Sequence, residues 1–282
     1  MAIERLNRPT RQEFEERFLR PQKPVVITGA MDHWPALKHW SNDYLRERAG
    51  TRAVRVSTAH RGVHFKGANQ ILDYSSMSLA EYIELISSRQ IADGRLYATV
   101  IPIQKTLPEL WGDVAFPEYF DREACASPNM WFGPGSNVSP LHYDSTHNFL
   151  TQIRGRKRVL LYHPREISRL YPFSFRERSL HISQVNLVEP DHARFPEFQK
   201  ADRMEVFLEP GEMLFIPLFW WHGVFGIEEN LSINYWWNTP LSAYLRYPRQ
   251  TVRGVGGLVA EGGRALWGAS KPPAASPPAP PA

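Results

Sequence analysis

The chain has a single cysteine, Cys125, among its 282 residues. One thiol excludes an intramolecular disulfide, and it also excludes a cysteine-built zinc or iron–sulfur centre, because such centres need several thiolates. No apolar run approaches the ~20 residues of a membrane-spanning helix. The first residues lack the apolar segment of a signal peptide. We therefore expect a protein of a reducing, cytoplasmic compartment that makes no membrane contact.

The chain also lacks a large excess of one charge sign, because it has 33 Lys and Arg residues and 29 Asp and Glu residues, which give a net charge of +4. Such a mild surplus does not by itself indicate a nucleic-acid-binding protein. Hydrophobic residues make up 43% of the chain and aromatic residues 12%, which is enough to bury a sizeable core. These figures predict a globular protein with one main catalytic or binding domain.

The hydrophobic pattern is mostly that of β-strands, short and bounded by turn residues. The ranges predicted as strands are 25–28, 53–57, 129–136, 148–153, 158–163, 213–221 and 231–237. Residues 154–157 predict a hairpin connection between two of these strands. Helices are expected over 11–18, 42–49 and 78–88, the last beginning with a capping pattern at Ser78 and Glu81. The sequence predicts a mainly β fold with flanking helices, built on a small antiparallel barrel.

Two histidines and an aspartate form the strongest chemical pattern. His142 and Asp144 lie two residues apart, so on a strand they point to the same face. His222 follows the apolar run 213–221, and a small antiparallel barrel would bring it back beside His142 and Asp144. Two imidazoles and one carboxylate are the ligands of non-haem iron(II) oxygenases, which leave the opposite metal positions open. We therefore predict one metal site at these three residues.

The other histidines show no spacing that indicates a second metal site. His147 follows closely after His142, but it falls on the opposite face of a regular strand, and we interpret it as pocket lining or surface. Ser136 and Ser139 lack the pattern of a nucleophile elbow. No competing catalytic group is indicated.

Several segments resemble the JmjC-type, cupin-like iron(II)- and 2-oxoglutarate-dependent dioxygenases, among them the asparaginyl hydroxylase of hypoxia-inducible factor. The similar segments are 20–30, 33–36, 139–144, 148–149, 155–158, 194–198 and 217–222, and the resemblance covers about the first 240 residues. It implies a double-stranded β-helix, the jelly-roll or cupin fold. It also implies Fe(2+) as the metal, 2-oxoglutarate as cosubstrate and O2 as oxidant.

The resemblance implies further site residues. Lys157 aligns with the lysine that pairs with the distal carboxylate of 2-oxoglutarate, although a solvated lysine in a basic hairpin remains the alternative. Tyr97 and Ser139 align with hydroxyl donors to that carboxylate, and Ser139 stands where the similar hydroxylase has threonine. The remaining candidates are two amides that line the cosubstrate pocket and three indoles of the substrate pocket or the barrel core: Asn148, Asn234, Trp131, Trp221 and Trp236.

The function implied is hydroxylation of a side chain of a protein or peptide, with release of succinate and CO2. Two enzymatic alternatives stay open: a tRNA nucleoside hydroxylase of the wybutosine type, with RNA as partner, and an N-methyl-lysine demethylase. A cupin-like binding protein without catalysis is the fourth hypothesis, and an open-faced ligand set beside a matching lysine argues against it.

The expected organisation has four parts. Residues 1–95 form an extension packed on the barrel, and residues 96–240 form the catalytic barrel. Residues 241–267 mix apolar side chains with glycine and predict an irregular appendage or a homodimer-forming tail. Residues 268–282 are rich in proline and predict a disordered tail.

Overall fold

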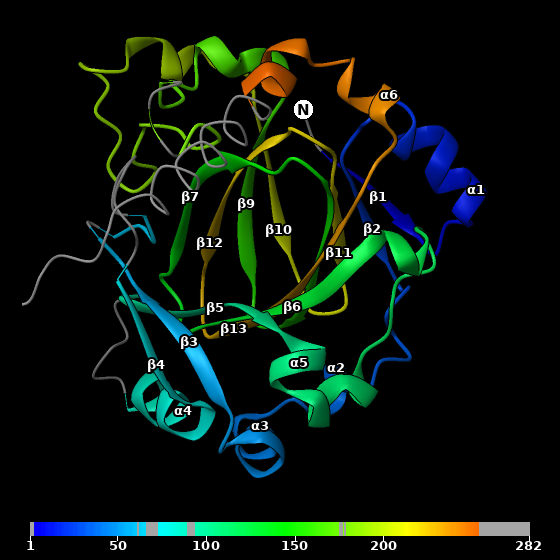
Figure 1. Ribbon diagram of the computed structural model, residues 1–282, viewed down its shortest axis with the longest axis vertical. Coiled ribbons are helices and arrows are strands. Elements are labelled where there is room, and N and C mark those ends of the chain that lie inside the picture. Colours follow the sequence, from blue (N-terminus) through cyan, green and yellow to red (C-terminus); the bar gives the residue numbers. More distant parts are fainter. Residues whose placement is uncertain are drawn as a thin grey trace, which may run out of the picture.

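The computed structural model describes residues 3–60, 62–65, 73–88, 94–174, 177 and 179–253 (Figure 1). The predicted proline-rich tail, and the predicted appendage beyond residue 253, lie outside these residues. Within the described part no helix is long and apolar enough to cross a membrane.

Two β-sheets face each other and enclose one hydrophobic cluster, and a larger cluster lies between the nine-stranded sheet and the helices (Figure 1). The larger sheet has nine strands in the order β1-β2-β11-β8-β13-β6-β5-β3-β4. Its strands are β1 (Glu4–Asn7), β2 (Val25–Thr28), β3 (Ala53–Thr58), β4 (Tyr74–Ser78), β5 (Leu96–Pro102), β6 (Cys125–Gly133), β8 (His147–Arg154), β11 (Met213–Ile216) and β13 (Asn230–Trp237).

The smaller sheet has four strands in the order β10-β9-β12-β7. They are β7 (Val138–Tyr143), β9 (Lys157–Tyr162), β10 (Arg203–Leu208) and β12 (Trp221–Gly226). From β6 onward the chain passes back and forth between the sheets, and only β9 and β10 follow each other in the same one. This alternation builds a double-stranded β-helix, which confirms the predicted fold class.

The connection at residues 154–157 is not a hairpin, because β8 and β9 do not pair with each other. Strand β8 pairs with β11 and β13, whereas β9 pairs with β10 and β12 in the opposite sheet. Gly155 has a φ of 64°, in the left-handed region, and turns the chain from one sheet into the other. A hairpin and a sheet-switching corner use the same turn residues, so the sequence pattern did not distinguish them.

The apolar run 213–221 is likewise two strands, not one. Strand β11 ends at Ile216, a turn occupies residues 217–220, and β12 begins at Trp221. Pro217 has no N–H for a ladder, and Phe219 has a φ of 64°, which breaks the extended backbone. His222 therefore lies near the start of a new strand in the smaller sheet.

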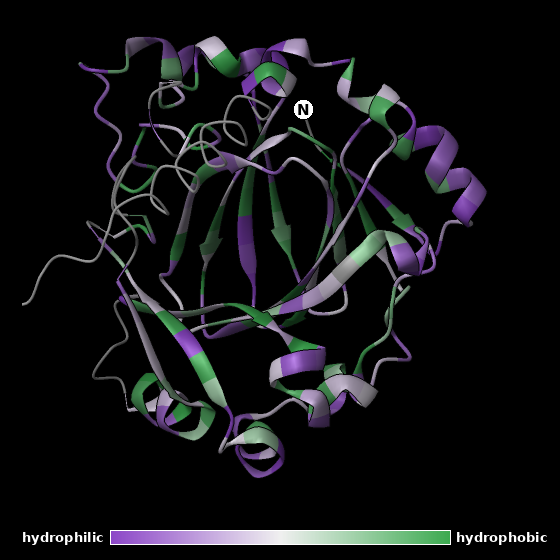
Figure 2. Cartoon of the chain, in the orientation of Figure 1, coloured by the Kyte–Doolittle hydropathy of each residue, from purple (hydrophilic) through white to green (hydrophobic). Residues whose placement is uncertain are grey.

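The helices lie outside the barrel (Figure 1). They are α1 (Arg11–Phe14), continued by a π-helical turn at Glu15–Leu19, then α2 (Ala36–His39), α3 (Asn42–Ala49), α4 (Leu79–Ser87), α5 (Ile103–Thr106) and α6 (Leu241–Tyr244). The predicted capping box of Ser78 and Glu81 is present at the start of α4. Hydrophilic residues dominate α1 in Figure 2, whereas hydrophobic residues colour much of β10 and β12. The helices pack on the larger sheet, where Phe14, Leu45 and Ile83 join its hydrophobic cluster.

The N-terminal extension continues the larger sheet in both directions. Strands β1 and β2 add to one edge through β11, while β3 and β4 add to the other through β5, which pairs with β6. After the barrel, residues 241–253 run back over it, and Tyr247 and Gln250 are buried there. Gln250 donates from Nε2 to the carbonyl oxygen of Pro164 at 2.6 Å.

A substitution at Gly155 tests the sheet-switching corner. In Gly155→Ala the new Cβ would overlap the carbonyl oxygen of Glu229, and the positive φ would be strained, so we expect a loss of about 1–3 kcal/mol in urea unfolding. Gly112→Ala is the control, since nothing lies within 4 Å of a Cβ there, and it should change stability by less than about 0.5 kcal/mol. Equal stabilities of Gly155→Ala and Gly112→Ala would contradict the assignment of Gly155 to a sheet-switching corner.

Candidate metal centre

His142 and His222 lie directly opposite each other on neighbouring antiparallel strands. They are register partners in β7 and β12, and their ring centroids are 4.2 Å apart with an angle of 52° between the planes. Cross-strand partners point to the same face of a sheet, here the inner face. Strand pairing therefore brings together two imidazoles that are far apart in the sequence.

Asp144 is the first residue after β7 and completes the cluster. Its Oδ1 lies 3.8 Å from Nε2 of His142, and its Oδ2 lies 3.7 Å from Nε2 of His222. One ligand atom from each of the three residues lies within 4.8 Å of the others. Among the described residues this is the one such group of His, Cys, Asp or Glu that could hold a metal ion.

Both imidazoles are oriented by backbone carbonyl groups. Nδ1 of His142 donates to the oxygen of Pro140 at 2.8 Å, and Nδ1 of His222 donates to the oxygen of Trp220 at 3.0 Å. With the proton on Nδ1, each Nε2 keeps its lone pair, as metal ligation requires. Burial, with a smaller contribution from His142, lowers the pKa of His222 to about 4 and keeps this ring neutral.

Asp144 is held in its ionised form by its surroundings. Burial alone raises its pKa, but the two histidines and two hydrogen bonds outweigh that effect and hold the pKa below its ordinary value. Trp236 donates from Nε1 to Oδ2 at 2.8 Å, and Asn148 donates from Nδ2 to the same oxygen at 3.1 Å. Asn234 donates to Oδ1 of Asn148 at 2.8 Å and so fixes the amide that supports the carboxylate.

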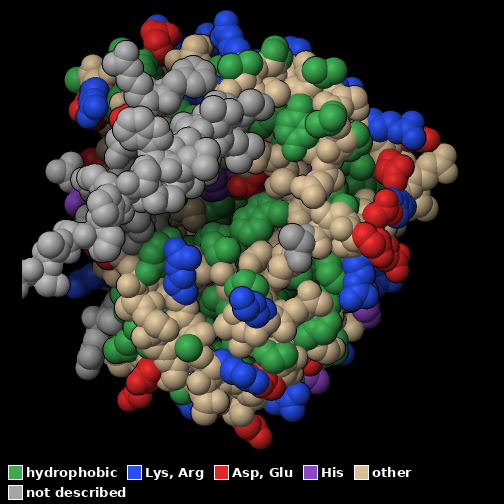
Figure 3. Space-filling model, in the orientation of Figure 1, with side chains coloured by type: hydrophobic (Ala, Val, Ile, Leu, Met, Phe, Trp, Pro, Cys, Tyr) green, Lys and Arg blue, Asp and Glu red, His purple; other side chains and the backbone are tan. Residues whose placement is uncertain are grey.

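A cavity inside the barrel joins the histidine–aspartate cluster to Lys157. It is lined by Tyr97, Trp131, Ser139, His142, Asp144, Asn148, Leu150, Lys157, Ile216, His222, Val224, Asn234 and Trp236. The structure thus brings ten of the eleven residues singled out in the sequence to one cavity. Figure 3 shows a hollow in the face turned to the viewer, with histidine and acidic atoms inside it and hydrophobic side chains at its wall.

Lys157 is buried at the far end of this cavity, with 1% of its surface exposed. Its Nζ donates to the hydroxyl of Tyr97 at 3.1 Å and to the hydroxyl of Ser232. Within the described ranges no carboxylate pairs with it. Burial lowers the pKa of Lys157 to about 7. A buried ammonium group with only hydroxyl partners is suited to an anionic ligand.

Ser232 was not predicted from the sequence. It precedes Asn234 and Trp236 on β13 at intervals of two residues. Asn234 and Trp236 line the cavity, and the hydroxyl of Ser232 accepts a hydrogen bond from Lys157. Strand alternation places residues two apart on one face, so the polar side chain of Ser232 in an otherwise apolar strand could have marked it as a cavity residue.

Two expectations are corrected. Trp221 does not line the cavity, because it neighbours His222 on β12 and strand alternation turns it to the outer face, where its ring meets Tyr143 at 4.7 Å. His147 is neither pocket lining nor surface, since it is 3% exposed and packs between Phe215 and Trp237. His147 is the first residue of β8, which belongs to the larger sheet and does not continue β7.

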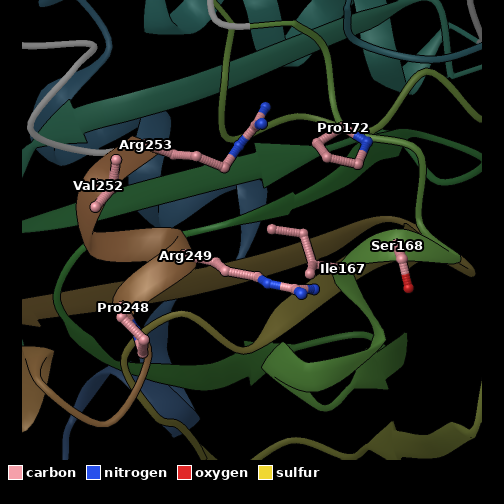
Figure 4. Close-up of a pocket in the computed structure, with 7 residues that line it drawn as sticks. All are labelled: Ile167, Ser168, Pro172, Pro248, Arg249, Val252 and Arg253. Carbon is pink, nitrogen blue, oxygen red and sulfur yellow. The ribbon is translucent and has the colours of Figure 1, made fainter.

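A second, largely apolar cavity lies between residues 248–253 and the segment after β9 (Figure 4). It is lined by Ile167, Ser168, Pro172, Pro248, Arg249, Val252 and Arg253. Arg253 donates from Nη2 to the carbonyl oxygens of Phe173 and Leu180. This cavity shares no lining residue with the histidine–aspartate site.

The double-stranded β-helix and the cluster inside it define a cupin-type protein with a His, Asp, His group that could hold a metal ion. The chain belongs to the cupin-like domain family, whose model matches residues 11–243. Lysine-specific demethylase 8 of Xenopus tropicalis is 38% identical over 243 residues, which cover 84% of this chain and 53% of that protein.

Two further relatives carry different names. Lysine-specific demethylase JMJ30 of Arabidopsis thaliana is 35% identical over 232 residues, covering 79% of this chain and 52% of the relative. The tRNA wybutosine-synthesizing protein 5 of Gallus gallus is 30% identical over 249 residues, which cover 81% of this chain and 76% of that protein. The chain spans just over half the length of the demethylase relatives. These matches confirm the family predicted from the sequence.

The buried lysine leads to a stability prediction. Because burial lowers the pKa of Lys157 in the folded chain to about 7, below the ordinary lysine value of 10.5, the unfolded chain binds the proton between these pH values and the folded chain does not. The contribution of Lys157 to stability therefore rises with pH across this window. Lys157→Met should stabilise the ligand-free protein more at pH 6 than at pH 9 in urea unfolding. Lys200→Met, at an exposed lysine, is the control. An equal effect of Lys157→Met at both pH values would contradict the burial of the Lys157 ammonium group.

Proposed function

We propose that this protein is an iron(II)- and 2-oxoglutarate-dependent oxygenase. The observation that supports it is the convergence of His142, Asp144, His222 and the buried Lys157 on one cavity. Two imidazoles and a carboxylate suit iron(II) and leave other coordination positions free. Lys157 supplies a cation for the far carboxylate of the 2-oxo acid.

Each part of the cavity has a defined task in this proposal. Trp236 and Asn148 hold the Asp144 carboxylate in place, and backbone carbonyls hold the two imidazoles. Tyr97, Ser139 and Ser232 offer hydroxyls around the lysine. Leu150, Ile216 and Val224 contribute an apolar wall that limits the access of water. When bound, iron(II) with 2-oxoglutarate and O2 supplies the oxidation of a C–H bond, with succinate and CO2 as co-products.

The substrate we propose is a side chain of a protein or peptide. Relatives named lysine-specific demethylases support a protein substrate. They also make oxidation of an N-methyl carbon on lysine the second candidate, since it is the same step on a different carbon. A tRNA nucleoside is the third candidate, supported by the wybutosine-synthesizing relatives.

Product analysis distinguishes these candidates. Incubation with iron(II), 2-oxoglutarate and peptide libraries should yield peptides heavier by one oxygen, whereas demethylation should yield methyl-lysine peptides lighter by one CH2 group. Mass spectrometry measures both outcomes. Turnover on tRNA alone would transfer the proposal to the nucleoside. A His142→Ala variant that kept full turnover would refute the assigned metal site.

The role of Lys157 can be tested through the cosubstrate. Lys157→Met should raise the KM for 2-oxoglutarate by at least ~30-fold, because losing one partner of a buried charge pair costs about 2 kcal/mol or more. Succinate formation as a function of 2-oxoglutarate concentration measures this. Lys200→Met, on the surface, should leave the KM unchanged. An unchanged KM in Lys157→Met would contradict anion binding at this end of the cavity.

A further inference from the structure

His147 is a buried histidine that the proposed chemistry does not use. Its Nδ1 accepts a hydrogen bond from the backbone N–H of Leu218 at 2.9 Å. Its ring packs on Phe215 and Trp237, with centroids 5.4 Å from each. The side chain therefore reaches from the start of β8 to the turn at residues 217–220, which crosses between the two sheets.

This 217–220 turn is strained and held from several sides. Phe219 has a φ of 64°, a backbone conformation that costs a residue with a Cβ on the order of 1 kcal/mol or more. Trp220 N–H donates to the oxygen of Pro217 at 3.1 Å, so the four residues close a tight turn. Nε1 of Trp220 donates to the oxygen of Gln22 at 2.9 Å. Such strain persists only where the surroundings fix the backbone.

The same turn connects two of the three metal-ligand candidates. Phe219 N–H donates to the backbone oxygen of Asp144 at 3.0 Å. The oxygen of Trp220 accepts the Nδ1 proton of His222 at 3.0 Å. A displacement of the turn would therefore shift the backbone of Asp144 and release the ring of His222. The hydrogen bond to His147 is made by Leu218, the residue directly before the two that make these contacts.

We propose that His147 is a positioning residue for the metal centre, which acts by fixing the 217–220 turn and through it Asp144 and His222. The inference rests on the proposed metal site. It goes beyond the ligand set, because His147 lies outside the cavity. The task requires a hydrogen-bond acceptor at Nδ1, and thus a neutral ring. Burial lowers the pKa of His147 to about 4, which is consistent with this requirement.

Two substitutions separate the acceptor from the bulk of the ring. Asn places its Oδ1 as many bonds from Cα as Nδ1 of histidine, so His147→Asn can still accept from Leu218 N–H. Leu places an apolar carbon there, and His147→Leu leaves the N–H buried without a partner, which destabilises the turn. Ile83→Val, in the buried face of α4, is a control that lowers stability away from the site.

Titration of each purified protein with Mn²⁺ as a probe, followed by calorimetry, measures the metal Kd independently of turnover. We expect His147→Leu to weaken binding by about 10-fold or more, as loss of an outer support typically does. His147→Asn should stay within about threefold of the wild type, and Ile83→Val should bind as the wild type does. Wild-type affinity in His147→Leu would overturn the inference.

A second variant decides the matter if His147→Leu does not fold. Leu218 is the second residue of the turn, a position that accepts proline, so Leu218→Pro removes the N–H donor while the turn can still close. Weakened Mn²⁺ binding in Leu218→Pro supports the inference, and unchanged binding contradicts it. If the wild type itself binds no Mn²⁺, the proposed metal site fails, and that outcome is distinct from failure of the His147 role.

Discussion

The structure depends on the register between β7 and β12. Pairing His142 with His222 places two imidazoles on the inner face of the smaller sheet. Because side chains alternate along a strand, a slip by one residue would turn one imidazole out of the cavity. The same strand β12 pairs with β9 on its other side, where Gly226 lies opposite Lys157. One strand thus aligns both ends of the cavity, the ligand cluster and the buried cation.

The surroundings of the cluster serve to hold this register. Backbone carbonyls orient both rings, an indole and a pair of amides hold the aspartate, and the 217–220 turn joins the two sides. Hydrophobic clusters lie inside the barrel and on the outer face of the smaller sheet, where Tyr143 and Trp221 pack. Both faces of the strands that bear the ligands are therefore fixed, which favours a preformed site.

Much of this could be predicted from local patterns. The His-x-Asp spacing identified two side chains on one face, and short apolar runs between turn residues identified most barrel strands. Which sheet each strand joins could not be predicted, because Gly155 and Pro217 are compatible with hairpins as well as with sheet-switching corners. The error at Trp221 could have been avoided from the sequence, because a side chain next to His222 on a strand points to the opposite face. The part of His147 in the site depends on a turn whose shape only the folded chain shows.

The most direct test of the account is anomalous X-ray diffraction from a crystal of the protein soaked with Mn²⁺ and 2-oxoglutarate. The account predicts one anomalous peak shared by His142, Asp144 and His222, with the distal carboxylate of the bound acid at Nζ of Lys157. A peak elsewhere, or an acid bound away from Lys157, would contradict it.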